Sequence, residues 1–277
     1  MSDNDIDELS EATELKLNKN QCKKYTQSQG YGLKKENDIS TIVFNLSENN
    51  NNTKKYDIDS KENKLKQNEN ISIKTTKGDY IDCGDIIRFY NYDFTKKNTI
   101  IIIKYEQIND YRYIKQIFEI NYNKKLHKLL FGSITKDILE NYVNNVKKIP
   151  TKTKGDKAKK IFDYLKNKNI IEKKYNMKIK ITPKVDSCQS RVQCRIKDFE
   201  DICKEYIEYD SSKEEKVNLC RNKEIPIKDF FPRRKRKGLT KTELIDICKK
   251  NKDKCKNYSK KNKDELKTML EGLGFLK

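Results

Sequence analysis

Tryptophan is absent from the sequence, histidine occurs once, and there are nine glycines and four prolines among 277 residues. The glycines are not grouped as in a Walker loop or a dinucleotide-binding turn, which argues against both classes of nucleotide-binding enzyme. Zinc fingers, zincins and HNH-type nucleases need several imidazoles or paired thiolates. The chain offers His127 and eight cysteines, no two of which are separated by two to four residues. The sequence therefore disfavours these metal-dependent classes.

Long apolar segments are also missing. The longest apolar run is residues 100–103, whereas a helix that crosses a membrane needs about 20 apolar residues. The N-terminus lacks the apolar core of a signal peptide. We therefore expect an intracellular protein without a membrane partner, and we expect its cysteines to be free thiols.

Charged residues outnumber hydrophobic ones. Hydrophobic residues make up 34% of the chain and charged residues 38%, so part of it has too little apolar surface to pack into a core. The formal net charge of +20 favours a polyanionic partner. The abundance of lysine, asparagine and isoleucine also indicates an AT-rich genome, which raises the lysine content for reasons unrelated to function.

The positive charge is unevenly distributed along the chain. Residues 1–20 carry six acidic residues and two lysines, a net charge of −4. Residues 147–184 carry fourteen lysines and three acidic residues, and residues 221–277 carry nineteen basic and eight acidic residues, a net charge of +11 in each stretch. Genome bias would spread lysine evenly and would not favour the arginines of the run 233–237. The C-terminal charge is therefore at least partly functional.

The pattern of apolar residues predicts an α+β fold. Residues 1–70 are polar, contain an asparagine tract at 49–52 and have one strand-like stretch at 40–46, so we expect a largely disordered segment. An α+β region, residues 71–230, begins with β-branched and aromatic runs separated by turn residues. They predict a small antiparallel sheet or barrel, as in SH3-like, OB-like and BAH-type modules. The predicted strands are residues 71–75, 80–90, 99–108 and 113–122.

Amphipathic helices follow these strands. Apolar residues recur at helical spacing over residues 135–146 and again over residues 158–165. Two further strands are predicted at 177–181, ended by Pro183, and at 191–196. The spacing then predicts another amphipathic helix over residues 199–209.

Residues 231–277 form a third part, in which two short helices are predicted behind the basic run 233–237. Thr240 and Glu243 have the spacing of a capping box, in which each side chain binds the backbone N–H of the other residue, and Asn262 and Glu265 repeat it. Short helices are stable in water only when they bury an apolar face. The apolar residues with helical spacing are Leu244, Ile247 and Cys248 in the first helix and Leu266, Met269 and Leu270 in the second.

The same part of the chain carries a family resemblance. Its residues are Leu239-Thr240, Glu243-Leu244 and Cys248-Lys249, then a loop, then Lys263, Glu265-Leu266 and Leu270. This order is similar to the SAP motif, a helix–extended loop–helix module that generally binds double-stranded DNA with a preference for AT-rich sequence. The resemblance covers residues 238–276, and residues 252–257 stand where the motif usually has a glycine. It implies that DNA is the partner.

The candidate nucleic-acid-binding residues lie in two places. We expect phosphate contacts from the C-terminal cations Arg233, Arg234, Lys235, Arg236, Lys237, Lys241, Lys260, Lys261 and Lys263. In residues 184–195, Gln189, Arg191, Gln193 and Arg195 are candidates to contact phosphates or base edges, with a polar turn beside a strand as the alternative. No cofactor is needed for binding. We expect the protein in the nucleus or another DNA-containing compartment, such as a viral factory, and the run 233–237 could alternatively serve only as a nuclear import signal.

A metal-dependent nuclease is the alternative function. A restriction-type site needs two carboxylates on neighbouring strands that bind Mg²⁺ beside a lysine. Asp163, followed by Glu172 and Lys174, fits that spacing, although Glu-x-Lys patterns recur in so charged a chain. A nucleophile at Cys188 or Cys194 with His127 as its base has no supporting local pattern.

Overall fold

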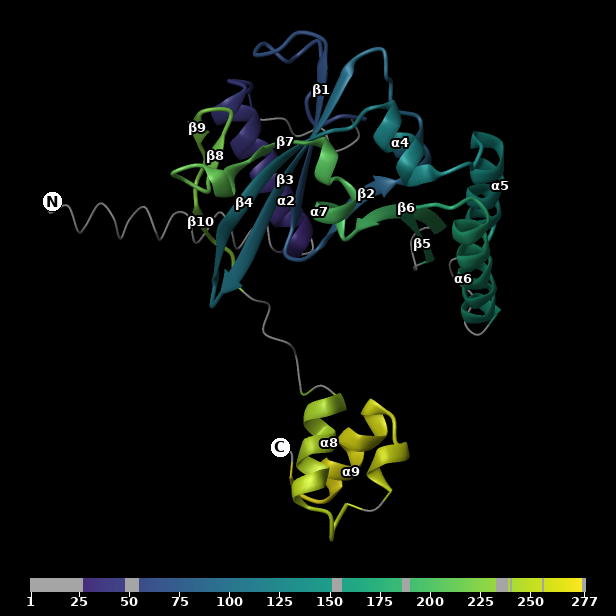
Figure 1. The fold of residues 1–277 in the computed structure, drawn as a ribbon. Helices are drawn as coiled ribbons and strands as arrows, with labels where there is room; N and C mark the ends of the chain where they lie inside the picture. The colour runs from purple at the N-terminus through teal and green to yellow at the C-terminus, as the bar shows by residue number, and fades with distance from the viewer. Residues whose placement is uncertain are drawn as a thin grey trace, which may run out of the picture. The chain divides into compact units, whose positions relative to one another are not determined.

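The computed structural model describes residues 27–47, 55–150, 156–185, 190–232, 239, 241–255 and 257–275, apart from the side chains of residues 27–29 and 157. It contains two compact units, which we call the body (Met1–Pro232) and the tail (Arg233–Lys277) (Figure 1). The chain is of mixed α+β class, as predicted. Within the described ranges, no helix has both the length and the apolar character that a membrane crossing requires.

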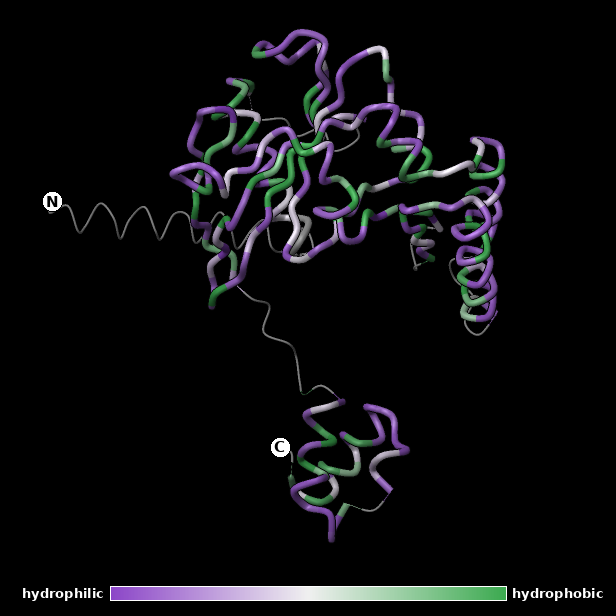
Figure 2. The backbone as a smooth tube through the Cα atoms, in the orientation of Figure 1, coloured by the Kyte–Doolittle hydropathy of each residue, from purple (hydrophilic) through white to green (hydrophobic). Residues whose placement is uncertain are grey.

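The main sheet of the body is built around β3 (Lys97–Ile108), which pairs with β1 (Glu69–Thr76) and with β4 (Tyr111–Asn121). Two shorter strands, β10 (Lys228–Phe230) and β7 (Ile207–Asp210), both pair with β4. Successive side chains of a strand point to opposite faces. Ile100 and Ile102 therefore enter one core, and Ile101 and Ile103 enter another. Figure 2 shows these hydrophobic strands at the centre of the body.

The prediction that four antiparallel strands form one sheet is wrong in two respects. β1 runs parallel to β3, with Ile73 opposite Ile101. β2 (Tyr80–Asp85) joins a different sheet, and the rest of the predicted strand 80–90 is the helix α3 (Ile86–Tyr90). The Asp85 side chain caps this helix by accepting the backbone N–H of Arg88. The alternation of apolar residues does not reveal this local bond.

The second sheet has the strand order β2-β6-β5, with β6 (Ser190–Lys197) at its centre and β5 (Ile179–Val185) at one edge. Val192, Cys194 and Ile196 of β6 are buried in the same core as Ile100. The predicted end of β5 before Pro183 is wrong, because the strand continues to Val185. An edge strand tolerates proline, since a residue on its free side donates no ladder hydrogen bond.

Helices pack into the core shared by the two sheets. The helices predicted at 135–146 and 158–165 are α5 (Lys136–Lys147) and α6 (Asp156–Lys174). The sequence does not predict α4 (Lys124–Phe131), which Asn123 caps by accepting the N–H groups of Lys125 and Leu126. Its residues Leu126 and Leu130 are fully buried in this core.

The prediction of a helix over residues 199–209 is wrong. The chain forms only a short helix, α7 (Phe199–Ile202), then the 3₁₀ turn η2 (Lys204–Tyr206), and then β7. Pairing of β7 with β4 overrides the helical spacing of the apolar residues. The 3₁₀ turn η3 (Ser211–Lys213) and the hairpin of β8 (Leu219–Cys220) and β9 (Lys223–Glu224) lead to β10.

The predicted strand at 40–46 is also wrong. Residues 27–43, which lie in the segment expected to be largely disordered, form α2 (Gln27–Asp38) and the π-helix η1 (Ile39–Val43). α2 is tied to β10 by a buried ion pair, in which Lys35 Nζ lies 2.6 Å from Asp229 Oδ2. Lys35 also donates to the carbonyl oxygen of Pro226 at 2.8 Å. These partners are about 190 residues away in the chain, so no local pattern reveals them. Residues 1–26 and 48–54 lie outside the described residues.

The tail contains the two predicted helices, α8 (Lys241–Lys250) and α9 (Lys263–Gly272), with the 3₁₀ turn η4 (Tyr258–Lys260) between them. Its core is made entirely from its own residues. The buried side chains of that core are Leu244, Cys248, Cys255, Leu266 and Leu270.

Candidate nucleic-acid interface

The start of α9 is fixed by the predicted capping box. Asn262 Oδ1 accepts the backbone N–H of Glu265 at 3.0 Å, and Glu265 Oε2 accepts the backbone N–H of Asn262 at 2.7 Å. The cap satisfies N–H groups that have no partner inside the helix. The matching box predicted at Thr240 and Glu243 includes a residue outside the described ranges. The capping box at Asn262 fixes where α9 begins, between the flanking lysines.

The connection between the two helices contains a residue with left-handed backbone. Asn257 has φ 57° and ψ 22°, a region that glycine adopts freely and asparagine tolerates better than other side chains. The sequence has no glycine at 252–257, and Asn257 supplies the turn in its place. The backbone then passes through η4 into the cap at Asn262.

Four lysines singled out by the sequence lie on the surface of the tail. Lys241, Lys260 and Lys263 are exposed, and Lys261 is half-buried. Within the described part of the chain, none of the four pairs with a carboxylate, whereas Lys249 pairs with Asp246 and Lys267 with Glu271. Lys260, Lys261 and Lys263 flank the cap of α9, where the partial positive charge of the helix adds to theirs. The run Arg233 to Lys237 lies outside the described residues.

In the body, the structure brings Arg191, Gln193 and Arg195 to one face of β6. They alternate with the buried residues Val192 and Cys194. The register extends the same face to both neighbouring strands, and we call this surface the outer face. Its members are Tyr80, Asp82 and Asp85 of β2, Arg191, Gln193, Arg195 and Lys197 of β6, and Lys180, Thr182 and Lys184 of β5. The fourth candidate, Gln189, lies outside the described residues.

Like charges stand opposite each other on the outer face. Arg195 is opposite Lys180, and Arg191 is opposite Lys184. The nearest carboxylates bind weakly: Asp82 lies 3.6 Å from Arg195, with 39% and 37% of the side chains exposed, and Glu172 lies 3.5 Å from Lys180. Five cations and two carboxylates, Asp82 and Asp85, therefore lie on this face.

The predicted arrangement of a nuclease site is wrong. Asp163, Glu172 and Lys174 all lie on α6 and not on neighbouring strands. Nine residues of helix separate the two carboxylates by about 13 Å. Glu172 is 7% exposed and its Oε1 accepts the N–H of Ile181 at 2.7 Å, so it anchors β5 to α6. The Lys174 ammonium lies over the ring of Tyr175. Across the described residues, no three His, Cys, Asp or Glu side chains are grouped to hold a metal ion.

Of the two candidate thiols, Cys194 is described, and His127 has other partners. The Nδ1 atom of His127 lies 2.8 Å from the Tyr122 hydroxyl, and the ring packs against Phe131 at 4.7 Å. Burial lowers the pKa of His127 to about 4. Cys194 is fully buried, and burial, together with Cys83, raises its thiol pKa. Neither group is poised as a nucleophile or its base, and Cys188 lies outside the described residues.

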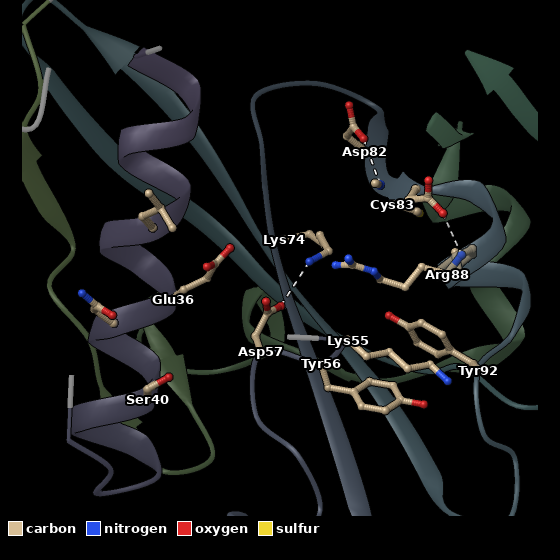
Figure 3. Close-up of a pocket in the computed structure, with 15 residues that line it drawn as sticks. Glu36, Ser40, Lys55, Tyr56, Asp57, Lys74, Asp82, Cys83, Arg88 and Tyr92 are labelled. Carbon is tan, nitrogen blue, oxygen red and sulfur yellow. Dashed lines mark hydrogen bonds and ion pairs between the residues drawn. The ribbon is translucent and has the colours of Figure 1, made fainter. Parts of the chain in front are cut away.

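A pocket of about 290 Å³ lies where α2, the segment before β1 and the β2–α3 turn meet. Figure 3 shows Glu36 and Asp57 approaching Lys74, with Arg88 reaching toward it from the other side. Lys74 Nζ lies 3.1 Å from Asp57 Oδ2, which also accepts the backbone N–H of Ile73. The Tyr92 hydroxyl shares a 2.7 Å hydrogen bond with Ser72. This mixture of charges suits a polar ligand with a positive and a negative group.

Burial and neighbouring charges shift the pKa values of two side chains that line the pocket. Burial, followed by the Asp57 carboxylate, raises the pKa of Glu36 to about 7. Burial lowers the pKa of Lys74, but Asp57 and other neighbours outweigh it, so the pKa is raised. The sequence does not reveal this pocket, because Glu36 and Asp57 lie in the segment expected to be disordered. In β1, Ile71 and Ile73 point to one face of the strand and Lys74 points to the other. This alternation is the one local signal in the sequence for the position of Lys74.

We find no known protein family, curated protein or solved structure that matches this chain.

Proposed function

We propose that the chain binds double-stranded DNA through its tail. Lys241, Lys260, Lys261 and Lys263 contact phosphates, together with the basic run at 233–237. The contacts are made to the backbone, so they give affinity with little choice of sequence. The resemblance of the tail to the SAP motif agrees with this role and adds a preference for AT-rich duplex.

One observation carries the proposal, namely the group of lysines at the start of α9 that pair with no carboxylate in the described part of the chain. Exposed lysines that already have a carboxylate partner are partly neutralised. Lys260 and Lys263 pair with no carboxylate in the described part of the chain, and they lie beside the start of α9, where the partial positive charge of the helix adds to theirs. The tail therefore offers a positively charged edge to a polyanion.

The test measures fluorescence anisotropy of a labelled 20-base-pair duplex over a range of salt concentrations. We expect the double variant Lys260→Gln/Lys263→Gln to bind less tightly and to lower the slope of log K against log salt by about 0.9 per lysine. The matched control, Lys249→Gln/Lys267→Gln, removes two exposed lysines of the same tail that pair with Asp246 and Glu271. We expect the control to change the slope much less.

Two outcomes would contradict the proposal. Equal losses in the two double variants would show that net charge alone governs binding. A chain that lacks residues 233–277 but keeps the affinity and the salt slope of the full chain would show that the tail is not the DNA contact.

A further inference from the structure

We propose that the outer face of the body is a second nucleic-acid site, separate from the tail, and that it binds a single strand. Its ligand class is a polynucleotide with unstacked bases, in contrast to the duplex proposed for the tail. The site lies on β2, β6 and β5, which Figure 1 shows apart from the main sheet. The argument uses only residues of the body and does not depend on the function of the tail.

The register of the cations is the first observation. Side chains directly opposite each other on neighbouring strands lie about 5 Å apart, and like charges at such positions are destabilising. Arg195 opposite Lys180 and Arg191 opposite Lys184 repeat this arrangement along the sheet. Asp82 and Glu172 lie at the edges of the Arg195–Lys180 pair, and an anion bound between Arg195 and Lys180 would reduce their repulsion further. A chain of phosphates supplies anions in such a series.

Hydrogen-bonding capacity is the second observation. The Nε atoms of Arg191 and Arg195 and the Oε1 atom of Gln193 have no hydrogen-bond partner among the described residues, although all three atoms are buried. A buried polar atom without a partner costs about 1–3 kcal/mol. A small rotation of either guanidinium toward a phosphate oxygen would give its N–H groups an acceptor. The face is thus incomplete without a polar ligand.

An exposed aromatic ring decides between duplex and single strand. Tyr80 is 47% exposed, and the Arg195 guanidinium lies 5.0 Å from the centre of its ring. In a duplex the bases stack on one another, so their faces are not available to a protein ring. An unpaired base can stack on an exposed aromatic side chain beside a positive surface. Tyr80 and Arg195 together offer that combination on the outer face.

The experiment uses the full chain and two labelled probes, a 15-nucleotide single strand and a duplex. We expect Arg191→Gln/Arg195→Gln to weaken single-strand binding about tenfold or more at 0.1 M salt and to leave duplex binding unchanged. The matched control, Arg234→Gln/Arg236→Gln, removes two arginines from the tail. We expect it to weaken duplex binding and to leave single-strand binding unchanged. Oligo-dT and oligo-U probes then distinguish DNA from RNA.

A second pair of variants tests whether the ring of Tyr80 contributes to binding by stacking. Neither variant changes the charge, and their unfolding temperatures show whether a loss of binding comes from misfolding. We expect Tyr80→Ala to weaken single-strand binding about tenfold, and Tyr80→Phe, which keeps the ring, to bind within about twofold of the original chain. Each variant should unfold at the same temperature as the original chain. The proposal is overturned if the chain does not bind the single strand, if the Arg191 and Arg195 variant binds it unchanged, or if the tail variant loses both probes equally. Loss of duplex binding alone bears on the tail and not on the outer face.

Discussion

Glu36 shows how a pocket changes the chemistry of one side chain. Its carboxyl group has an ordinary pKa of 4.5, and burial beside Asp57 raises the pKa to about 7 in the folded chain. Between these values the folded chain keeps a proton that the unfolded chain has released. The free energy of unfolding therefore decreases as pH rises from about 4.5 to 7. Above that range Glu36 is ionised in both states, and the decrease has reached its full size.

Replacement of Glu36 by glutamine removes the charge and keeps the shape. We expect Glu36→Gln to raise the free energy of unfolding by about 2 kcal/mol at pH 8 and to change it little at pH 4. Urea unfolding at pH 4, 6 and 8 measures the difference. Glu205→Gln, which removes an exposed carboxylate from the same unit, is the control for net charge. A gain in Glu36→Gln that is equal at pH 4 and pH 8 would contradict the assignment.

At the scale of elements, one side chain joins the β8–β9 hairpin to the main sheet. Arg221 and Asn222 form its two-residue turn, and both have left-handed backbone, with φ 49° and 64°. Such turns suit the twist of a hairpin, but a long side chain is uncommon there. Arg221 donates to both oxygens of Glu69 on β1 at 2.9 and 3.0 Å and to Glu119 on β4 at 3.0 Å. These charged hydrogen bonds offset the unfavourable backbone.

Removing the guanidinium would leave two carboxylates close together in the main sheet. We expect Arg221→Gln to lower the free energy of unfolding by about 3–5 kcal/mol at pH 7. The loss should shrink toward pH 4, because the carboxylates of the variant can take up protons. Lys216, just before the hairpin, pairs with Glu224 of β9 in solvent, so Lys216→Gln should cost less than about 1 kcal/mol. Chemical denaturation of both variants at pH 4 and 7 tests this, and similar losses in the two variants would contradict the buried role of Arg221.

The sequence predicted the elements whose apolar pattern is long and regular. β3, β4, β6, α5, α8 and the capped start of α9 are examples. It failed where distant residues decide the structure. The short apolar run at 40–46 suits a helix or a strand equally. Its first residues belong to the π-helix η1, whose residues Ile39 and Val43 pack with the isoleucines of β1 and β3. Glu172 and Lys174 fitted a catalytic spacing, but the Glu172 carboxylate accepts a hydrogen bond from the backbone N–H of Ile181 and holds β5 against α6.

The candidate interface was partly predictable, because part of it depends on a local pattern and part on the pairing of distant strands. Arg191, Gln193 and Arg195 lie at every second position of a predicted strand, which places them on one face. Their partners on that face, Tyr80 and Lys180, depend on the register of β6 with its two neighbours. Register is a property of the folded sheet, so no local pattern identifies Tyr80 as part of a binding surface.

At the scale of the whole molecule, the chain consists of two units with separate cores. The cores of the body use only residues before Arg233, and the core of the tail uses only residues after Pro232. A unit with its own core can fold by itself. Binding of DNA by the tail would then leave the outer face and the pocket of the body unchanged in structure.

This independence predicts the behaviour of a shortened chain. We expect a chain that ends at Pro232 to unfold cooperatively within about 2 °C of the temperature at which the body of the full chain unfolds, because no core residue of the body is removed. Tyrosine circular dichroism measures the transition, and amide NMR spectra of the two chains should overlay for residues 55–150. The same shortened chain should keep single-strand binding and lose duplex binding. A lower transition temperature or shifted amide signals throughout the body would show that the tail is part of one cooperative unit.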